Sequence, residues 1–553
     1  MKPELIITGA RVLTMDPARP RAEAVALGAG RILALGRDAE IAALAGPGTR
    51  RIAAGGRTLL PGFVESHLHL VLGGEELSQL HLGHVEGAAA LRAAFAGYAA
   101  AHPNRPLLMA QGAQYGILGH PVTRHDLDAV IADRPIAMMA PDHHTVWANT
   151  AALTAAGLLH GASMPPGHVV VMGEDGTATG ELREFEAFTA VLALGGAAHL
   201  QLGIATGEEP DPWPDAGQRA VDKARVAAGL AHAARHGITA MVNMDGNRYT
   251  LALLAEMEAE GRLTARVVVP FHFKPHMDLA ALDRAEAMAR DFRGDRLRSG
   301  FVKMFMDGVV DSRTAYLLED YPGTAERGTA LFDADRFAAI CTEIDRRGLQ
   351  IAVHAIGDGA VRRTIDGYAA ARAANGPRDS RHRIEHIELI DRADIPRLGA
   401  LGITASLQPP HPPGAMDFPL STMEEVIPRH RWRDAYLWRT LADHGAPLAF
   451  GSDWPVTDIS PLRGLQAAMT RRPYPGAADE RVTLAEALQA YTAGGAWAAH
   501  LDDVTGRIAP GLAADLVLLD ADLEALPADR IATAGIALTI AGGQITHAGT
   551  GFA

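Results

Sequence analysis

Two histidines, His67 and His69, are separated by one residue and close the run 60–66, which is apolar over its first five residues. If that run is a β-strand, side chains two positions apart point the same way, so both imidazoles aim at one point. Two convergent imidazoles form half of a metal site. With 24 histidines in 553 residues, a His-x-His triplet also arises by chance, and the alternative is a pair of loop histidines. The β-prone segment before the pair and the glycine break at 73–74 favour the metal site.

Four further short apolar segments each carry a residue that can bind a metal at or near the end of the segment. These residues are Lys303, His354, His386 and Asp453. Helix-like stretches flank the segments, for example 251–262 and 333–347, where apolar residues recur at three and four spacing. Alternating strands and helices predict a parallel α/β fold, and polar residues at strand C-termini are typical of the active face of a (β/α)₈ TIM barrel.

The spacing of β-prone segments predicts about eight barrel strands, the number that such a barrel needs. They are expected at 60–67, 238–243, 266–273, 301–305, 350–354, 383–386, 402–408 and 447–453. One gap, 75–216, is too long for a single crossover helix and contains proline and glycine clusters. We interpret it as an inserted α+β subdomain after the first strand. Because inserts after barrel strands lie where substrates enter, it is expected to shape the pocket.

Three local strings, 302–308, 354–358 and 451–456, together with the histidine pair, resemble the metal-dependent amidohydrolase superfamily. They are most similar to its amidohydrolase-3 branch, which includes N-substituted formamide deformylases. The resemblance covers nearly the whole chain, with the motifs in the right order. It implies a barrel over residues 59–500 beside one β-sandwich that combines residues 1–58 with residues 501–553. The sequence by itself predicts two separate small β units at the two ends.

The resemblance also implies a site that holds two divalent metal ions, with zinc as the expected metal. His67, His69 and Asp453 would hold one ion, and His354 with His386 the other. Lys303 would carry a carbamate, an anion that bridges both ions. The alternative for this residue is a lysine that extends to solvent at the barrel rim.

Two metals a few ångströms apart share a hydroxide, because they lower the pKa of the bound water from 15.7 toward about 7. Asp453 is the candidate catalytic residue, which would take the proton and deliver it to the departing nitrogen. The alternative for Asp453 is a turn or helix-capping aspartate. Its place at the end of the last barrel strand favours catalysis.

Three further residues are candidates for binding the substrate. His144, in the string 142–149, is similar to a family segment in which a histidine faces the substrate. Arg313 could orient a carbonyl or carboxylate group, or only cap a helix, and His411 lies just past the seventh strand. For each of them, the alternative is a structural role in a loop.

Composition is ordinary for a soluble globular protein, with 48% hydrophobic and 21% charged residues. A formal net charge of -14 argues against nucleic acid or an anionic membrane as partner, because either would repel the chain. No apolar run approaches the length of a membrane span, and no signal-peptide core precedes residue 5. The single Cys341 is expected to be buried. A cytoplasmic location is therefore expected, and oligomeric state is left open.

The sequence thus predicts a hydrolase that acts on a carbon-nitrogen bond other than a peptide bond in a small molecule, with amide or formamide hydrolysis as the leading form. One alternative is a mononuclear deaminase of the same superfamily, which Lys303 disfavours because a single metal needs no bridging ligand. Another is a non-catalytic binding or regulatory homologue. Each of the six positions at which the resemblance implies a metal ligand carries a residue able to bind metal, which favours an enzyme.

Overall fold

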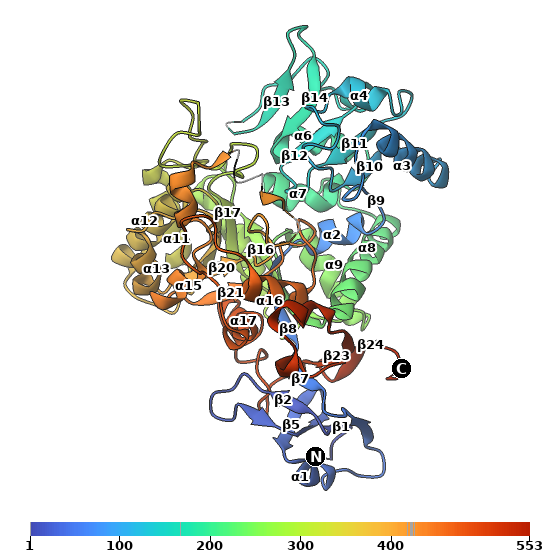
Figure 1. Ribbon diagram of the computed structural model, residues 1–553, viewed down its shortest axis with the longest axis vertical. Helices are drawn as coiled ribbons and strands as arrows, with labels where there is room; N and C mark the ends of the chain where they lie inside the picture. The colour runs from blue at the N-terminus through green and yellow to red at the C-terminus, as the bar shows by residue number, and fades with distance from the viewer. Residues whose placement is uncertain (1, 166, 417, 421–423, 425, 553) are drawn as a thin grey trace.

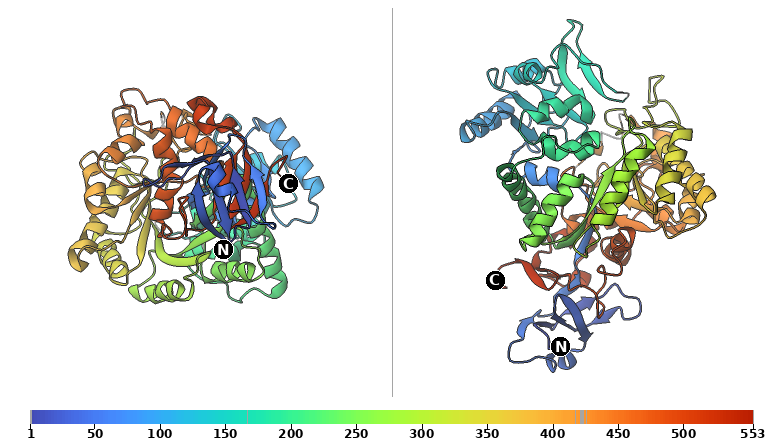
Figure 2. Two further views of the ribbon diagram at one scale, coloured as in Figure 1. Left: turned by 90° about the horizontal axis from the view of Figure 1, so that it is seen from below. Right: turned by 180° about the vertical axis from the view of Figure 1, so that it is seen from behind.

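A computed structural model of the protein describes residues 2–165, 167–416, 418–420, 424 and 426–552. Its centre is an eight-stranded parallel sheet that curves almost into a closed barrel (Figure 1, Figure 2). The strands follow in chain order: β8 (Phe63–Leu68), β15 (Ile238–Asn243), β16 (Arg266–His272), β17 (Leu297–Phe305), β18 (Gln350–Ala355), β19 (Arg383–His386), β20 (Thr404–Leu407) and β21 (Leu448–Phe450). A bridge between Leu68 and Trp454 brings the two ends of the sheet together. The expected barrel is confirmed.

Helices cover the outside of the barrel, so its strands are buried on both faces, as is usual for parallel sheets. They are α8 (Ala216–Arg235), α9 (Arg248–Ala259), α10 (Leu282–Asp291), α11 (Ala334–Arg346), α12 (Asp358–Asn375), α13 (Ile395–Leu401), α15 (Trp438–Asp443), α16 (Pro461–Thr470), α17 (Leu484–Ala490) and α18 (Ala493–Ala498). In α11, Phe337, Ile340, Cys341 and Ile344 form the buried stripe. The free thiol is therefore in the core, as expected. Among the described helices, none combines the length and the apolarity needed to cross a bilayer.

Strands from both ends of the chain share one β domain beside the barrel, where blue and red strands meet in Figure 1. One sheet contains β5 (Arg31–Gly36), β4 (Ala24–Gly28), β1 (Leu5–Thr8) and β6 (Arg50–Ala53). The other contains β24 (Gln544–Ala548), β23 (Ile536–Ala541), β22 (Leu516–Leu519), β7 (Thr58–Pro61), β2 (Arg11–Leu13) and β3 (Arg21–Ala22). The antiparallel pairing of Leu60 with Val517 joins the two ends. The expectation of two separate β units, drawn from the sequence alone, is wrong.

The segment between β8 and β15 forms an insert with its own sheet, at the end of the molecule opposite the terminal β domain (Figure 1). Its strands, in spatial order, are β13 (Val169–Met172), β14 (Ala178–Arg183), β12 (Thr145–Ala148), β11 (Ile136–Met139), β10 (Leu108–Gln111) and β9 (Leu80–His81). Its helices are α2 (Leu70–Glu76), α3 (Ala88–Ala101), α4 (Arg124–Asp128), α5 (Thr150–Ala155), α6 (Phe185–Ala193) and α7 (Ala198–Thr206). Successive residues of β10 enter two different hydrophobic clusters, because side chains alternate across a sheet.

Candidate metal centre

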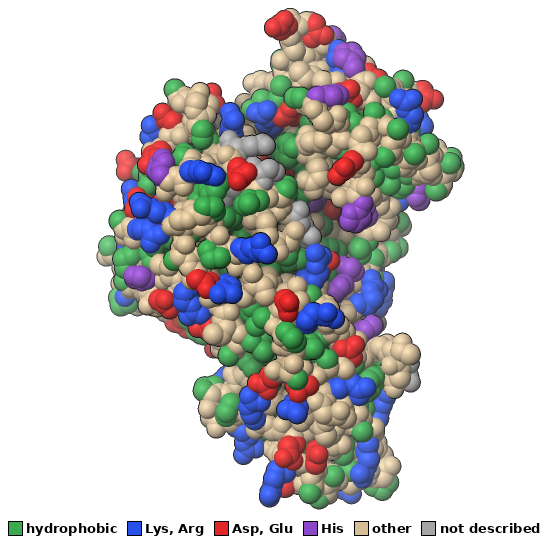
Figure 3. Space-filling view, in the orientation of Figure 1, with side chains coloured by type: hydrophobic (Ala, Val, Ile, Leu, Met, Phe, Trp, Pro, Cys, Tyr) green, Lys and Arg blue, Asp and Glu red, His purple; other side chains and the backbone are tan. Residues whose placement is uncertain are grey.

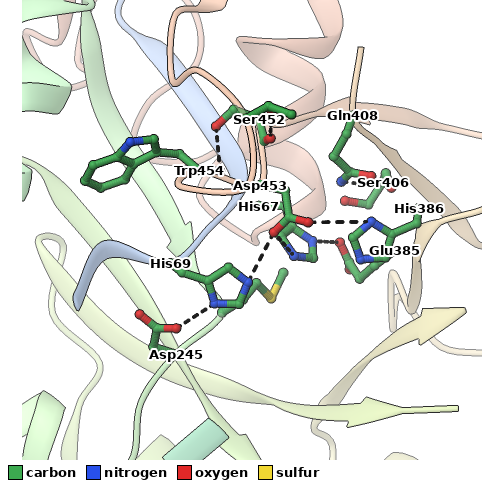
Figure 4. A network of polar contacts seen from close by, with 12 residues as sticks. His67, His69, Asp245, Glu385, His386, Ser406, Gln408, Ser452, Asp453 and Trp454 are labelled. Carbon is green, nitrogen blue, oxygen red and sulfur yellow. Dashed lines mark hydrogen bonds and ion pairs between the residues drawn. The ribbon is translucent and has the colours of Figure 1, made fainter. Parts of the chain in front are cut away.

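The C-terminal ends of the barrel strands bring histidines from distant parts of the sequence into contact. The ring of His386 lies 4.9 Å from that of His67 and 4.5 Å from that of His354, measured between centroids. The His67 and His69 rings are 5.7 Å apart. All four rings are buried. Four histidines that were expected to hold metal therefore lie together at one end of the barrel. Figure 4 labels three of them, His67, His69 and His386.

The Asp453 carboxylate lies at the centre of this group. Its Oδ1 atom is 3.2 Å from His67 Nε2 and 3.1 Å from His69 Nε2. Its Oδ2 atom is 3.9 Å from His386 Nδ1 and 3.8 Å from His411 Nε2. Figure 4 shows the carboxylate between the rings of His67, His69 and His386. One buried anion thus faces four imidazoles.

Close contacts between the last strand and the first fix the turn that presents Asp453. The backbone N–H of Asp453 donates to the carbonyl of His67 at 2.7 Å, and its φ of 59° lies in the left-handed region. A non-glycine residue holds such a conformation only where its surroundings enforce it. At Gly451, an added Cβ would lie 2.6 Å from the His67 nitrogen, so only glycine allows this approach. The backbone therefore aims the carboxylate at the site.

Buried carboxylates contact the ring nitrogens of His67 and His69 that face away from Asp453. His67 Nδ1 lies 2.6 Å from Glu385 Oε2, and His69 Nδ1 lies 2.6 Å from Asp245 Oδ1. Arg383 binds Glu385 with two hydrogen bonds of 2.6 and 3.0 Å. A carboxylate on one ring nitrogen fixes the orientation of the ring and directs the other nitrogen into the site. No sequence motif indicated a role for Glu385 or Asp245, although both lie at or just past a barrel strand end.

The environment sets the charge of these groups. Burial lowers the pKa of His354 and of His386 well below the usual value, which keeps both rings neutral, the form that binds metal. Burial disfavours the Asp453 anion, but His67 and His69 hold the pKa of that carboxyl well below its usual range. Burial also disfavours the charged form of His69, which by itself would lower the pKa of this ring. Asp245 and Asp453 nevertheless raise that pKa to about 9. The carboxylates around this ring therefore favour a positive charge in the site, and a divalent metal ion would also supply one.

Lys303 lies at 1% exposure in the same part of the barrel. Its Nζ atom is 5.0 Å from the centroid of the Phe305 ring, and none of the described carboxylates comes within ion-pair distance of it. Burial lowers the pKa of this amine to about 8. The neutral fraction of this amine near neutral pH is therefore larger than for an exposed lysine, and the neutral amine is the form that adds to carbon dioxide.

Buried ligand atoms that make ion-pair contacts but no hydrogen bond fit a metal ion. In the described part of the chain, Asp453 Oδ1, His386 Nδ1 and His411 Nε2 have no hydrogen-bond partner. Ligand atoms lie within 4.8 Å of one another in two triads, each of which includes Asp453. One triad adds His67 and His69, and the other adds His386 and His411. Imidazole nitrogens with a carboxylate suit zinc and other divalent first-row metals. The resemblance pairs His386 with His354, whereas this second triad contains His411.

A cavity opens onto Asp453, His354, His386 and His411. His144 from the insert also lines it, and His144 Nδ1 lies 2.7 Å from Glu184 Oε2. Burial would lower the pKa of His144, but Glu184 raises it to about 9. Arg313, in contrast, is exposed and lies outside the residues that line this cavity. Of the three substrate-binding candidates, the structure places His144 and His411 at the cavity and Arg313 away from it.

Known proteins resemble the chain over most of its length. The chain is 28% identical to the protein LONG AFTER FAR-RED 3 of Arabidopsis thaliana, with 93% of this chain and 87% of the relative aligned. It is 29% identical to YtcJ of Bacillus subtilis over 98% of each chain. It is 24% identical to an N-substituted formamide deformylase of Arthrobacter pascens over 94% of each. The fold matches the crystal structure of an uncharacterized metal-dependent hydrolase from Pyrococcus horikoshii with a TM-score of 0.73 and 22% identity, covering 95% and 99% of the two chains.

A barrel with clustered histidines and a central carboxylate defines the protein as an enzyme of the metal-dependent hydrolase class. The model of the amidohydrolase family matches residues 50–547. The chain belongs to this family. The family resemblance inferred from the motifs is confirmed.

Proposed function

We propose that the protein hydrolyses a carbon-nitrogen bond of a small non-peptide amide, with an N-substituted formamide as the leading substrate class. One observation carries this proposal: Asp453 lies within 3.2 Å of His67 and His69 and faces His386 from its other oxygen. This arrangement combines a ligand set with a proton acceptor. The 24% identity to an N-substituted formamide deformylase supports the choice of bond.

We assign His67, His69 and Asp453 to one metal ion. We assign His354 and His386 to a second ion, with a carbamate on Lys303 between the two, and zinc as the metal. His354 Nε2 donates to the carbonyl of Gly308 at 3.1 Å, which leaves its Nδ1 free to bind metal. When bound, such ions polarise a carbonyl group and lower the pKa of water. His411 lies beside Asp453 in the cavity and is assigned to the substrate.

The chain's own residues then perform the proton transfers. Asp453 would accept the proton of the attacking water and deliver it to the departing nitrogen. A protonated His144, held by Glu184, would donate its Nε2–H to the substrate carbonyl oxygen, where negative charge develops. The buried cavity wall keeps bulk water from these groups and strengthens the electrostatic interactions that they make. The buried thiol and the family support a soluble, cytoplasmic enzyme.

A panel of N-alkylformamides and acetamides tests this assignment. Zinc-replete protein should release formate or acetate and the free amine in equal amounts, and the Asp453→Asn variant should release neither at a comparable rate. Release of ammonia from amino-substituted rings, with no amide cleaved, would contradict the proposal and favour the deaminase alternative. Absence of turnover on every substrate, with metal fully bound, would favour a binding role.

A further inference from the structure

Glu65 lies in β8, two residues before His67, and its side chain is fully buried. Its Oε1 atom accepts a hydrogen bond from the backbone N–H of Ser452 at 2.6 Å. Ser452 follows β21 and directly precedes Asp453, and Figure 4 shows the two residues side by side. A side chain of the first barrel strand therefore binds the backbone of the turn that carries the central carboxylate of the candidate metal centre.

The shape of this turn creates the need for a side-chain acceptor. The backbone N–H of Gly451 donates to a carbonyl of β20, as in a regular parallel sheet. The next two N–H groups, of Ser452 and Asp453, both face β8, although successive N–H groups of a regular strand point to opposite neighbours. The carbonyl of His67 accepts the bond from Asp453 at 2.7 Å. A buried N–H needs a partner, and Glu65 provides it for Ser452.

The approach of the Glu65 carboxyl to this backbone requires a glycine at position 451. A Cβ added to Gly451 would lie 2.7 Å from Glu65 Oε1, which is too close for a real side chain. Glycine removes that obstacle. The segment 451–453 thus combines a residue without a side chain, a donated N–H and a left-handed aspartate, all of which face β8.

The other oxygen of Glu65 shows that this carboxyl is a poor choice for stability alone. Glu65 Oε2 is buried and has no hydrogen-bond partner among the described residues. A buried polar atom without a partner costs free energy, so an apolar side chain would suit a purely structural position better. The contact that Oε1 makes with the turn explains the presence of this residue.

We propose that Glu65 is a positioning residue for Asp453. Its carboxyl oxygen fixes the backbone of the turn 451–453, so that Asp453 Oδ1 lies beside His67 and His69 before a metal binds. A ligand that is held in place loses less freedom on binding, which raises metal affinity. This role needs an oxygen acceptor and no charge, whereas Glu385 acts on the ring of His67 through its charge. It concerns the turn and the metal, and holds whichever bond the enzyme cleaves.

Hydrogen-deuterium exchange of the metal-free protein tests the contact directly. Glu65→Met keeps a side chain of similar length and removes the acceptor, so the amides of 452 and 453 should exchange about 10-fold faster or more. Glu65→Gln keeps an oxygen and should exchange like the wild type. Glu480→Met is the matched control, because Glu480 is also buried and accepts the backbone N–H of Thr440 at 2.9 Å, outside the cavity at Asp453. It should leave exchange at 451–454 unchanged.

Competition of zinc between the protein and a chromophoric chelator measures the consequence for the metal. Glu65→Met should weaken zinc binding about 10-fold or more, while Glu65→Gln and Glu480→Met should bind zinc like the wild type. Thermal unfolding is measured on the same samples. A purely structural role would lower the unfolding temperature of both methionine variants and leave the zinc affinity of the folded proteins unchanged. Rescue by glutamine therefore separates positioning from stability.

Wild-type zinc affinity and unchanged exchange at 451–454 in Glu65→Met would overturn the proposal. An equal loss of zinc affinity in Glu65→Gln would overturn it as well, because the effect would then belong to the charge. If Glu65→Met does not fold, Glu65→Asp replaces it, with a shorter side chain and the same expected losses. These readouts need no turnover, so a failure to cleave any amide would refute the proposed reaction and leave the role of Glu65 to be decided by exchange and zinc affinity.

Discussion

The Nδ1 atom of His67 lies 2.6 Å from Oε2 of Glu385, while its Nε2 atom points at Asp453. Glu385 is itself fully buried and bound by Arg383. A ligand histidine whose second nitrogen is held in this way loses little freedom when metal binds, and the carboxylate raises its basicity. The first strand of the barrel and the sixth therefore act together on one imidazole.

Glu385→Gln should weaken metal binding about 10-fold to 100-fold, because the amide keeps the shape but removes the charge behind His67. Competition with a chromophoric chelator measures the affinity. The variant should remain folded by circular dichroism. Glu343→Gln, which removes the charge of a half-buried carboxylate that pairs with Arg346 on α11, serves as the control and should bind metal like the wild type. Unchanged affinity in Glu385→Gln would contradict a role for this pair.

Lys303→Ala should lower the metal content from close to two ions per chain, because the proposed carbamate bridges both ions. Elemental analysis of protein grown with ample zinc gives the stoichiometry. Lys223→Ala provides the matched lysine control, with an unchanged content expected. At most one ion per chain, unaffected by the Lys303 substitution, would instead indicate a mononuclear site.

Asp453→Asn should reduce kcat by about 100-fold to 10,000-fold, because an amide cannot accept the proton that the reaction must move. Steady-state kinetics on the best formamide found measures the loss, and metal content is determined on the same sample. Asp479→Asn, at a surface pair with Arg481, should leave kcat unchanged. Retained activity in Asp453→Asn would rule out the proton-transfer role.

His144→Ala should raise KM and weaken discrimination among amides, because His144 lines the cavity and is not assigned as a metal ligand. Glu184→Gln should act in the same direction with a smaller effect, since it loosens the orientation of the ring. Both variants should keep wild-type metal content. If His144→Ala strips metal, the proposed ligand set is wrong, and if it alters neither KM nor substrate ranking, His144 is structural.

Asp345 is expected to contribute to acid sensitivity of the fold. Burial opposes its ionisation, but hydrogen bonds from His382, Asn375 and Arg378 lower its pKa well below the usual value. A depressed carboxyl pKa stabilises the folded protein above the unfolded value, about 3.9, and this contribution is lost as the pH falls through the folded value. Asp345→Asn should cost about 3 kcal/mol at pH 7 and flatten the decline of stability between about pH 5 and 2. Urea unfolding across this range measures both, and a decline as steep as in the wild type would contradict the assignment.

The sequence by itself determined the barrel and the identity of its chemical groups. Strand periodicity with polar residues at strand ends indicated the order of β8 to β21, because a strand buried on both faces must be an apolar run. His67, His69, Lys303, His386 and Asp453 stood at those ends and lie together in the structure. Local pattern was sufficient here, because parallel strands bring their C-termini to one face.

Tertiary structure alone decided which groups meet across that face. The sequence gives no register between strands, so it could not show Glu385 behind His67, or Asp245 behind His69. Nor could it place Arg313 outside the cavity, or Lys274 and Lys303 on one Phe305 ring. The joining of β7 to β22 likewise needed structure, because strand pairing over more than 450 residues leaves no local pattern. Long-range contacts depend on how the elements pack, and packing is a property of the whole chain.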